Sequence, residues 1–435
     1  MWSFPPIDDT VIDFTPARLG EPAIKTTYKI DRELFVSHDV RVSYFVRSTD
    51  LSTSQKISDA PAFECAGPRE KIFFDPADLV CGIVTCGGLC PGLNDVIRTI
   101  TLTLHWEYNV KKVLGFRFGY QGLSENPHEE PIELTPESVD AIQHLGGTIL
   151  GSSRGHQEPA EMVATLRKHN IRLLFVIGGD GTFAGAHAIW QECQRQGQKI
   201  SIIGIPKTVD NDIYFTETTF GYVTAVEEAR RILGHAHVEA KASWNGVSLV
   251  KLMGRDSGFI AAGATIASGD VNFCLIPEVP IVPDGPQGLL AKLEQRLDRK
   301  HHALIVVAEG AGQELIADSE PADRDASGNV VYENIGTYLK NLIKDYFGQK
   351  GKPVTVRYFD PSYEIRSCPA NAKDSAYCLL LGQNAVHAGM AGKTDMFVGF
   401  WNQHYIHVPL AAAINRRKRL DTRGQLWQTI LTTLE

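Results

Sequence analysis

Four short runs of apolar, largely β-branched residues constrain the fold of this chain most strongly. They span residues 80–85, 173–177, 202–205 and 304–308, and each is followed directly by a glycine-rich or polar turn. Strands that are apolar on both faces and alternate with helices are typical of parallel sheets covered by helices on either side. We therefore predict an α/β protein whose ligands bind at the carboxyl ends of these strands.

Helical periodicity fills the intervals between the apolar runs. Residues 95–105 and 219–237 carry apolar side chains at helical spacing. The first 79 residues differ, because prolines divide them into short alternating pieces such as residues 40–46. We expect these 79 residues to form an N-terminal extension with one or two edge strands.

Composition excludes several classes of function. The 435 residues carry a formal net charge of −8, so no global positive field is available to hold nucleic acid or an anionic membrane. No apolar run approaches the ~20 residues that a membrane helix needs, and residues 1–6 lack a secretory pattern. The eight cysteines are scattered and predict reduced thiols rather than disulfides or a zinc site. We expect a cytoplasmic protein without nucleic-acid or membrane partners.

A first glycine-rich turn, Gly87-Gly88-Leu89-Cys90-Pro91-Gly92-Leu93-Asn94, follows the first apolar run. Glycines between a strand and a helix let backbone N–H groups approach an anion, and the helix N-terminus adds partial positive charge. A phosphate fits such a turn. A tight strand-to-helix connection also needs glycine for structural reasons alone, so this turn leaves both interpretations open.

A second glycine-rich turn, Gly178-Gly179-Asp180-Gly181-Thr182-Phe183-Ala184-Gly185, contains a carboxylate. Asp180 lies where a divalent cation bridging nucleotide phosphates needs an oxygen ligand, and Gly181 leaves room for a triphosphate. The alternative is that Asp180 simply caps the following helix.

A third segment, Pro206-Lys207-Thr208-Val209-Asp210-Asn211-Asp212, follows the third apolar run. If the segment is extended, Thr208, Asp210 and Asp212 point the same way and converge on one point. A substrate hydroxyl would meet a candidate general base there. A surface Asx-turn is the alternative reading.

Cationic and acidic residues elsewhere complete this pattern. Arginine suits bidentate phosphate binding and stabilises charge on a transferred phosphoryl group, and the candidates are Arg154, Arg255, Arg357 and Arg366. Each of them taken alone also fits a surface ion pair. Glu309, directly after the fourth run, is placed to accept hydrogen bonds from a sugar hydroxyl. The basic run 416–419 reads as a solvated face, with a polyanion or localisation patch as the alternative.

Together these segments resemble the 6-phosphofructokinases over residues 80–410. The Gly87-to-Asn94 turn, Gly178-Gly179-Asp180-Gly181, the Pro206-to-Asp212 segment and Met253-Gly254-Arg255 occur in that family's order and spacing. The resemblance implies two Rossmann-like three-layer α/β domains with mostly parallel sheets and an active site in the cleft between them. A nucleotide-binding domain would span 80–221 with 365–410 returning to it, a sugar-phosphate domain 222–364, and a C-terminal tail 411–435.

The resemblance also implies roles, residue by residue. It assigns nucleotide binding to Gly88, Arg154, Gly155, Gly179, Asp180, Gly181, Thr182 and Gly185, with Asp180 near Mg²⁺. It makes Asp210 the catalytic base, assisted by Arg255 and Thr208. It assigns the sugar phosphate to Thr208, Val209, Asp210, Asp212, Met253, Gly254, Arg255, Glu309, Tyr363 and Arg366, with Arg357 supplied by a neighbouring subunit. A homodimer or homotetramer is therefore expected.

Three positions depart from the simplest bacterial pattern. Tyr363 stands where many bacterial kinases carry histidine, Gly246 replaces a second intersubunit arginine, and Lys207 replaces a glycine. Lys207 is typical of the branch that contains both pyrophosphate-dependent and ATP-dependent enzymes. Pyrophosphate-dependent relatives usually carry aspartate at the position of Gly181, where it would crowd the α-phosphate of ATP. We therefore expect ATP as donor, with pyrophosphate as the alternative.

Other classes fit less well. The NAD kinase and diacylglycerol kinase relatives share Gly-Gly-Asp-Gly but lack the Pro206-to-Asp212 and Met253-to-Arg255 segments. A non-catalytic regulatory homologue would be expected to lose Asp180, Asp210 or Arg255, and all three are present. A redox Rossmann protein would need G-x-G-x-x-G after a strand, which is absent.

Overall fold

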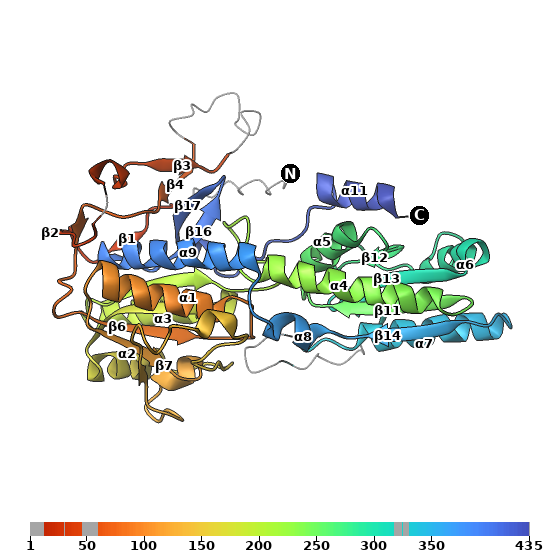
Figure 1. Ribbon diagram of the computed structural model, residues 1–435, viewed down its shortest axis with the longest axis horizontal. Helices are drawn as coiled ribbons and strands as arrows, with labels where there is room; N and C mark the ends of the chain where they lie inside the picture. Colours follow the sequence, from red (N-terminus) through yellow and green to blue (C-terminus); the bar gives the residue numbers. More distant parts are fainter. Residues whose placement is uncertain (1–12, 30, 46–59, 317–323, 325–329, 435) are drawn as a thin grey trace.

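The computed structural model describes residues 13–29, 31–45, 60–316, 324 and 330–434. These residues form two main sheets that lie side by side along the long axis of the molecule (Figure 1). The larger sheet contains, in spatial order, β3 (Arg41–Ser43), β4 (Ala62–Cys65), β17 (His404–Pro409), β16 (Met396–Trp401), β10 (Ser201–Pro206), β9 (Ile171–Gly178), β6 (Val80–Thr85), β7 (Lys112–Phe116) and β8 (Ile132–Glu133). The five strands from β16 to β7 are parallel, and each strand outside them pairs antiparallel with its neighbour.

The smaller sheet is wholly parallel. Its strands, in spatial order, are β12 (Phe273–Leu275), β13 (His302–Ala308), β11 (Gly246–Leu252) and β14 (Thr355–Phe359). The sequence predicted apolar strands at 80–85, 173–177, 202–205 and 304–308, and the structure has β6, β9, β10 and β13 there. The first three of these are neighbours in the larger sheet, and the fourth is central in the smaller one. The predicted α/β class is confirmed.

Helices cover both faces of each sheet. On the larger sheet, α1 (Leu93–Leu102) packs beside α9 (Ala372–Met390), while α2 (Pro159–Lys168) packs beside α3 (Asp180–Arg195) on the other face. The smaller sheet is covered by α4 (Tyr222–Lys241) and α5 (Phe259–Ser268) on one face and by α6 (Leu289–Lys300) and α7 (Ile335–Gln349) on the other. The remaining helices are the short α8 (Ser362–Ser367) and α10 (Leu410–Ala413) and the C-terminal α11 (Gln425–Thr433).

The two helices predicted from periodicity are present with shifted ends. The helix expected over 95–105 is α1, which begins at Leu93 and continues as a π-helical turn at Thr103–Glu107. The helix expected over 219–237 is α4, which begins three residues later than predicted and extends to Lys241.

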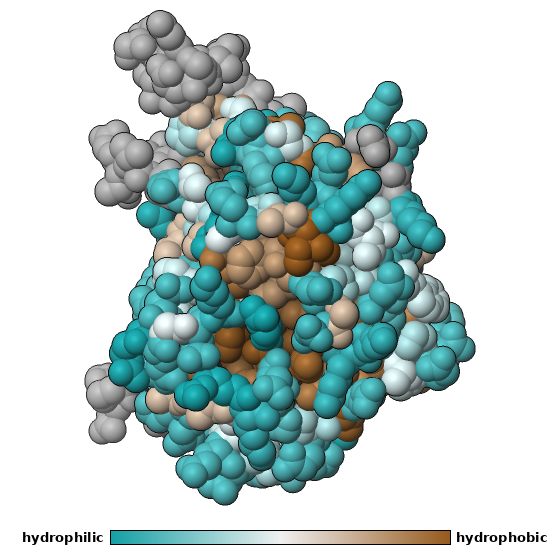
Figure 2. Space-filling view, turned by 90° about the vertical axis from the view of Figure 1, so that its left-hand side faces the viewer, coloured by the Kyte–Doolittle hydropathy of each residue, from teal (hydrophilic) through white to brown (hydrophobic). Residues whose placement is uncertain are grey.

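The N-terminal extension is joined to the larger sheet rather than separate from it. The strand expected over 40–46 is β3 (Arg41–Ser43), although residue 46 lies outside the described residues, and β3 and β4 form one edge of the sheet. Short strands add two further pairs, β1 (Ala17–Arg18) with β15 (Lys393–Thr394) and β2 (Ile24–Lys25) with β5 (Lys71–Ile72). Figure 2 looks at the end of the molecule that includes this extension and shows apolar side chains in a hollow rimmed by hydrophilic ones.

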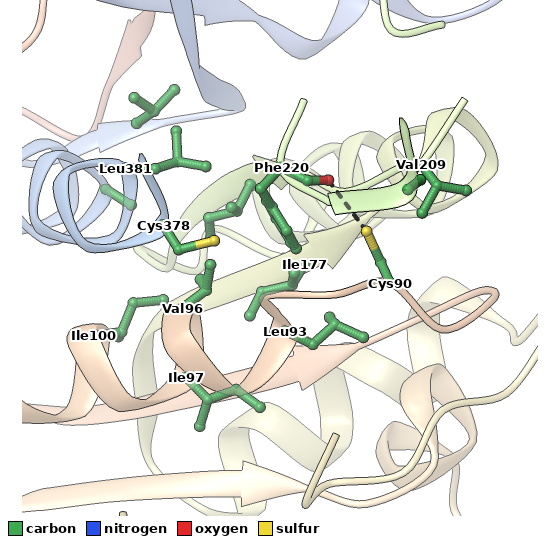
Figure 3. Packing of buried hydrophobic residues seen from close by; sticks show 14 of the residues in the cluster. Cys90, Leu93, Val96, Ile97, Ile100, Ile177, Val209, Phe220, Cys378 and Leu381 are labelled. Atoms are coloured by element: carbon green, nitrogen blue, oxygen red, sulfur yellow. Dashed lines mark hydrogen bonds between the residues drawn. The ribbon is translucent and has the colours of Figure 1, made fainter. Parts of the chain in front are cut away.

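A continuous apolar cluster packs α1, α9 and the chain ahead of α4 against one another. Val96 and Ile100 of α1 lie toward Cys378 of α9, Phe220 lies beside Cys378, and Leu93, Ile97 and Leu381 belong to the same cluster (Figure 3). The Cys90 thiol donates to the Phe220 carbonyl at 3.1 Å, which ties the first glycine turn to the chain ahead of α4. All eight cysteines are free, as the sequence predicted. Within the described part of the chain, no helix combines the length and apolar character needed to span a bilayer.

Candidate active site

One large cleft, with a volume of about 940 Å³, lies at the carboxyl ends of strands from both sheets. Loops after β6, β9 and β10 form its walls on the side of the larger sheet, and residues after β11, β13 and β14 form them on the other side. The sequence-predicted residues that line it are Gly88, Arg154, Gly155, Gly179, Asp180, Gly181, Thr182, Gly185, Lys207, Thr208, Val209, Asp210, Asp212, Met253, Arg255, Glu309, Tyr363 and Arg366. The fold therefore gathers these residues at the edge where parallel sheets bind ligands.

The buried side chain of Lys207 contacts the first glycine turn. Gly87 has φ +85°, and a side chain there would meet the Lys207 ammonium. The Lys207 Nζ donates to the Gly88 carbonyl at 2.7 Å, and burial lowers the pKa of Lys207, against the charge of Asp210. Lys207 thus shapes the phosphate-facing turn.

Two predicted arginines converge on the same turn. A Cβ placed on Gly88 would lie 3.6 Å from Arg366 Nη1 and 3.7 Å from Arg154 Nη2. The Arg366 guanidinium also lies over the Tyr363 ring, 4.8 Å from its centroid, and Tyr363 is 72 % exposed. A bulky side chain at Gly88 would displace both guanidinium groups from the position where an anion would meet them.

The second glycine turn carries Asp180 into the cleft. Gly179 is the N-cap of α3 and Asp180 is its first residue, with no side-chain capping hydrogen bond, so the N-cap interpretation of Asp180 is wrong. Burial raises the pKa of Asp180, the Arg417 charge and an N–H from Asn415 lower it, and the Asp212 carboxylate raises it again. A Cβ on Gly181 would meet nothing within 4 Å, so the cleft is open at this position.

The third segment is a turn rather than an extended strand. Asn211 has φ 56°, in the left-handed region, and the Asp210 N–H donates to Thr208 Oγ1 at 3.1 Å. The predicted alternation of side chains over Thr208, Asp210 and Asp212 is therefore wrong, although all three line the cleft. The turn brings them together because its backbone reverses locally, while Thr219 Oγ1 donates to the Thr208 carbonyl at 2.6 Å.

Asp210 is a buried carboxyl group whose surroundings strongly raise its pKa. Burial and the Asp212 and Glu309 carboxylates raise its pKa well above the ordinary aspartate range, against the charges of Arg255 and Lys207. Its Oδ1 is buried and has no hydrogen-bond partner among the described residues. A buried acceptor is costly unless something binds it, so Oδ1 is placed to receive a proton from a ligand in the cleft.

The smaller sheet contributes Arg255 and Glu309 to the opposite wall. Arg255 donates to the Val330 carbonyl and lies over the Tyr332 ring, 5.0 Å from its centroid. Burial raises the pKa of Glu309, while Lys251 and Arg255 lower it. Glu309 lines the cleft, and its hydrogen bond to a sugar hydroxyl stays a prediction.

Two predicted residues do not line this cleft. Gly254 has φ +123°, and a Cβ there would lie 2.5 Å from the Ser257 carbonyl oxygen, so this glycine permits the turn that presents Arg255. Arg357 pairs with Glu239 at 3.0 Å and donates to Ser243 Oγ at 2.9 Å, away from the cleft of its own chain. Supply of Arg357 to a neighbouring subunit stays a prediction.

The structure adds cleft residues that the sequence interpretation missed. Lys251, Tyr332 and Arg417 also line the cleft, and Asp256 pairs with Arg417. The interpretation of residues 416–419 as a solvated face is wrong, because Lys418 is 7 % exposed and Arg417 faces the cleft. The basic run was visible in the sequence, but nothing local indicated that it crosses the site.

The site fits a magnesium ion carried in with phosphates. Among the described residues, no group of three His, Cys, Asp or Glu could hold a metal alone. Mg²⁺ usually takes only one or two protein carboxylates and completes its shell with water and phosphate oxygens. The half-buried Asp180, with Asp212 near enough to raise its pKa, offers that donor set.

The fold and the cleft define an α/β protein in which glycine-rich turns and a buried carboxyl group line one cleft, an arrangement typical of phosphoryl transfer. Comparison with protein families matches residues 80–389 to the phosphofructokinase family. The chain is 50 % identical to an ATP-dependent 6-phosphofructokinase of Borreliella burgdorferi (85 % of this chain, 84 % of that protein). It is 47 % identical to one of Trypanosoma brucei brucei (89 % and 80 %).

Solved structures agree on the fold. A pyrophosphate-dependent phosphofructokinase from Marinobacter aquaeolei superposes with a TM-score of 0.68 at 23 % identity, covering 82 % of this chain and 90 % of that one. The family match over residues 80–389 and the relatives about half identical to it show that the chain belongs to the phosphofructokinase family.

Proposed function

We propose that this chain is an ATP-dependent 6-phosphofructokinase, which transfers the γ-phosphoryl group of ATP to the 1-hydroxyl of fructose 6-phosphate and yields fructose 1,6-bisphosphate and ADP. The observation that carries the proposal is the Oδ1 of Asp210, which is buried without a hydrogen-bond partner among the described residues and belongs to a loop that lines the cleft beside the glycine turns. Relatives about half identical to the chain and named for this activity support it.

Each group of cleft residues has its own role in the proposed reaction. Asp210 accepts the proton of the attacking hydroxyl, and Thr208 holds the turn through its hydrogen bond from the Asp210 N–H. Arg255 and Arg154 balance the charge of the phosphoryl group in transfer, and Arg366 with Tyr363 holds the sugar phosphate. Mg²⁺ beside Asp180 would supply further neutralisation of the donor phosphates.

The donor is decided at Gly181. The space beside this residue is open, so the bulk of a nucleotide is accommodated there. The Lys207 ammonium, which could favour a small dianionic donor, is engaged by the Gly88 carbonyl at 2.7 Å. Pyrophosphate remains the alternative donor.

Initial rates with fructose 6-phosphate and Mg²⁺ test the donor directly, comparing ATP with pyrophosphate at matched concentrations. We expect turnover with ATP alone. Turnover with pyrophosphate alone would contradict the assignment and give Lys207 the larger influence.

We further propose that the chain assembles as a homodimer or homotetramer in the cytoplasm. Arg357 lies outside its own cleft, on a surface with Glu239 and Ser243, as expected of a residue that serves a neighbouring subunit. Sedimentation velocity of the full chain checks the assembly, and Arg357→Ala should then raise the KM for fructose 6-phosphate.

One plant relative is chloroplastic, so fractionation of the source cells is the test of location.

A further inference from the structure

The segment that follows α10 runs across the cleft before it reaches α11. We define residues 415–420 as the C-terminal strap. The Asn415 N–H donates to Asp180 Oδ1 at 3.3 Å, and the Lys418 N–H donates to the Asp212 carbonyl at 2.8 Å. The Leu420 N–H donates to Glu278 Oε1 at 2.8 Å, and Glu278 also accepts from the N–H of Gly258 at the start of α5. The strap therefore touches loops that belong to both sheets.

Lys418 anchors the strap beneath the catalytic turn. Its ammonium is buried and donates to Asn211 Oδ1 at 3.1 Å, to the Thr216 carbonyl at 2.8 Å and to the Glu217 carbonyl at 3.0 Å. Arg417 pairs with Ile213 in an antiparallel bridge on the same stretch. Because the backbone is held on both sides of it, the Arg417 side chain has a defined direction into the cleft.

Arg417 is embedded among the carboxylates of three catalytic loops. It forms an ion pair with Asp256, the residue directly after Arg255, and the Tyr332 hydroxyl donates to the other oxygen of Asp256 at 2.8 Å. Burial alone would lower the pKa of Arg417, but the Asp256, Asp212 and Asp180 carboxylates raise it. Arg417 is 31 % exposed on its side chain, so it reaches the cleft while it holds Asp256.

This arrangement meets a requirement of the reaction. Polyphosphate donors are highly anionic, and the Asp180 and Asp212 carboxylates that line the cleft would repel them without a compensating cation. A guanidinium holds a carboxylate with one edge and offers phosphate oxygens its planar array of donors.

We propose that Arg417 is a further substrate-binding residue of the site, delivered by the C-terminal strap, and that it binds the phosphate chain of the nucleotide beside Asp180. This inference rests on the proposed kinase function and adds a donor-side residue to it. Part of the cleft wall therefore comes from the strap, whose Arg417 lies more than 150 positions away from its partner Asp256 in the sequence.

The test compares Arg417→Gln and Arg417→Lys with Arg423→Gln, a matched control that removes an exposed arginine six positions further along. For Arg417→Gln we expect the KM for Mg–ATP and the dissociation constant of Mg–ADP, measured by calorimetry, to rise about tenfold or more. The KM for fructose 6-phosphate should change less. Arg417→Lys should recover part of the loss, and Arg423→Gln should stay within about twofold of wild type.

Unchanged Mg–ADP binding and unchanged KM for Mg–ATP in Arg417→Gln would overturn the inference, and a lowered unfolding temperature alone would assign Arg417 a structural role. Failure of the wild-type chain to phosphorylate fructose 6-phosphate would instead count against the proposed function. The calorimetric comparison with Mg–ADP still decides the role of Arg417 in that case.

Discussion

At the scale of the residue, Asp210 shows how one side chain is prepared for proton transfer. Its Oδ1 is buried without a partner among the described residues, and two further carboxylates raise its pKa. Such a group destabilises the empty site and becomes useful only when a hydroxyl arrives to share its proton.

Asp210→Asn should lower kcat by about 10²- to 10⁴-fold and leave the KM values nearly unchanged, because the amide cannot accept the proton while it keeps the shape of the side chain. Steady-state rates with fructose 6-phosphate and Mg–ATP measure both constants. Thermal unfolding is the control: replacing a buried carboxylate that Asp212 and Glu309 repel with a neutral amide should leave the unfolding temperature at or above that of the wild type. Wild-type turnover in this variant would remove Asp210 from the role of base.

The pH dependence should report the raised pKa of Asp210. The base must be ionised to act, so kcat/KM falls as pH drops through its pKa, and this acid limb should lie above the ordinary aspartate value of 3.8. Glu309→Gln removes one of the carboxylates that raise this pKa, so its acid limb should move to lower pH than that of the wild type. An acid limb at the same pH in both proteins would show that Asp210 does not sense Glu309.

At the scale of the element, the start of α3 joins a structural turn to a binding surface. Gly178 could not carry a side chain there, since a Cβ would lie 2.3 Å from Thr182 Oγ1, whereas Gly181 faces open space. The fold requires glycine at position 178, whereas Gly181 leaves room for a ligand. A change at Gly181 therefore separates donor binding from folding.

Gly181→Asp should raise the KM for Mg–ATP by about tenfold or more, because a carboxylate in this space repels and crowds the nucleotide phosphates. Gly181→Ala is the matched control, with a small uncharged side chain. The unfolding temperature of both variants should stay close to that of the wild type, since nothing lies within 4 Å of the added Cβ. Unaltered ATP kinetics in Gly181→Asp would show that the donor is chosen elsewhere.

At the scale of the whole molecule, one buried carboxylate joins the N-terminal extension to the larger sheet. Glu64 of β4 is 1 % exposed and accepts from Lys393 Nζ at 2.6 Å and from Arg69 Nη2 at 3.0 Å, while His407 Nδ1 lies 3.3 Å away. Burial alone would raise the pKa of Glu64, but hydrogen bonds from His38 and His407 and the charges of His407 and Lys393 lower it. The extension is thereby joined to the larger sheet by buried ion pairs.

Glu64→Gln should lower the free energy of unfolding by about 3–5 kcal/mol, because it leaves the Lys393 and Arg69 cations buried without their carboxylate. Urea unfolding at pH 7 measures this loss, and Glu70→Gln, an exposed neighbour, is the control. A lowered folded-state pKa contributes stability above the ordinary glutamate value of 4.5 and loses it as pH falls further. As pH falls below 5, the free energy of unfolding of Glu64→Gln should therefore decrease less than that of the wild type. Equal decreases in the two proteins would show that the Glu64 carboxylate does not contribute this stability.

Much of the site was accessible from short windows of sequence. The apolar runs predicted β6, β9, β10 and β13, and the turns after them carry the residues that line the cleft. The conformation of the Thr208-to-Asp212 segment was not predicted, because the left-handed backbone at Asn211 depends on hydrogen bonds with Thr219 and Lys418. Those partners lie outside the local window.

The sequence by itself determined the α/β class, the strand ends, the glycine turns and the family motifs, since all of these depend on periodicity or on backbone freedom within a few residues. Only the tertiary structure decided that Arg417 enters the cleft, that Glu64 meets Lys393 and that Arg357 faces away from its own site. These contacts join residues that are far apart along the chain. Which of them meet depends on the path of the whole backbone, and no local pattern records that path.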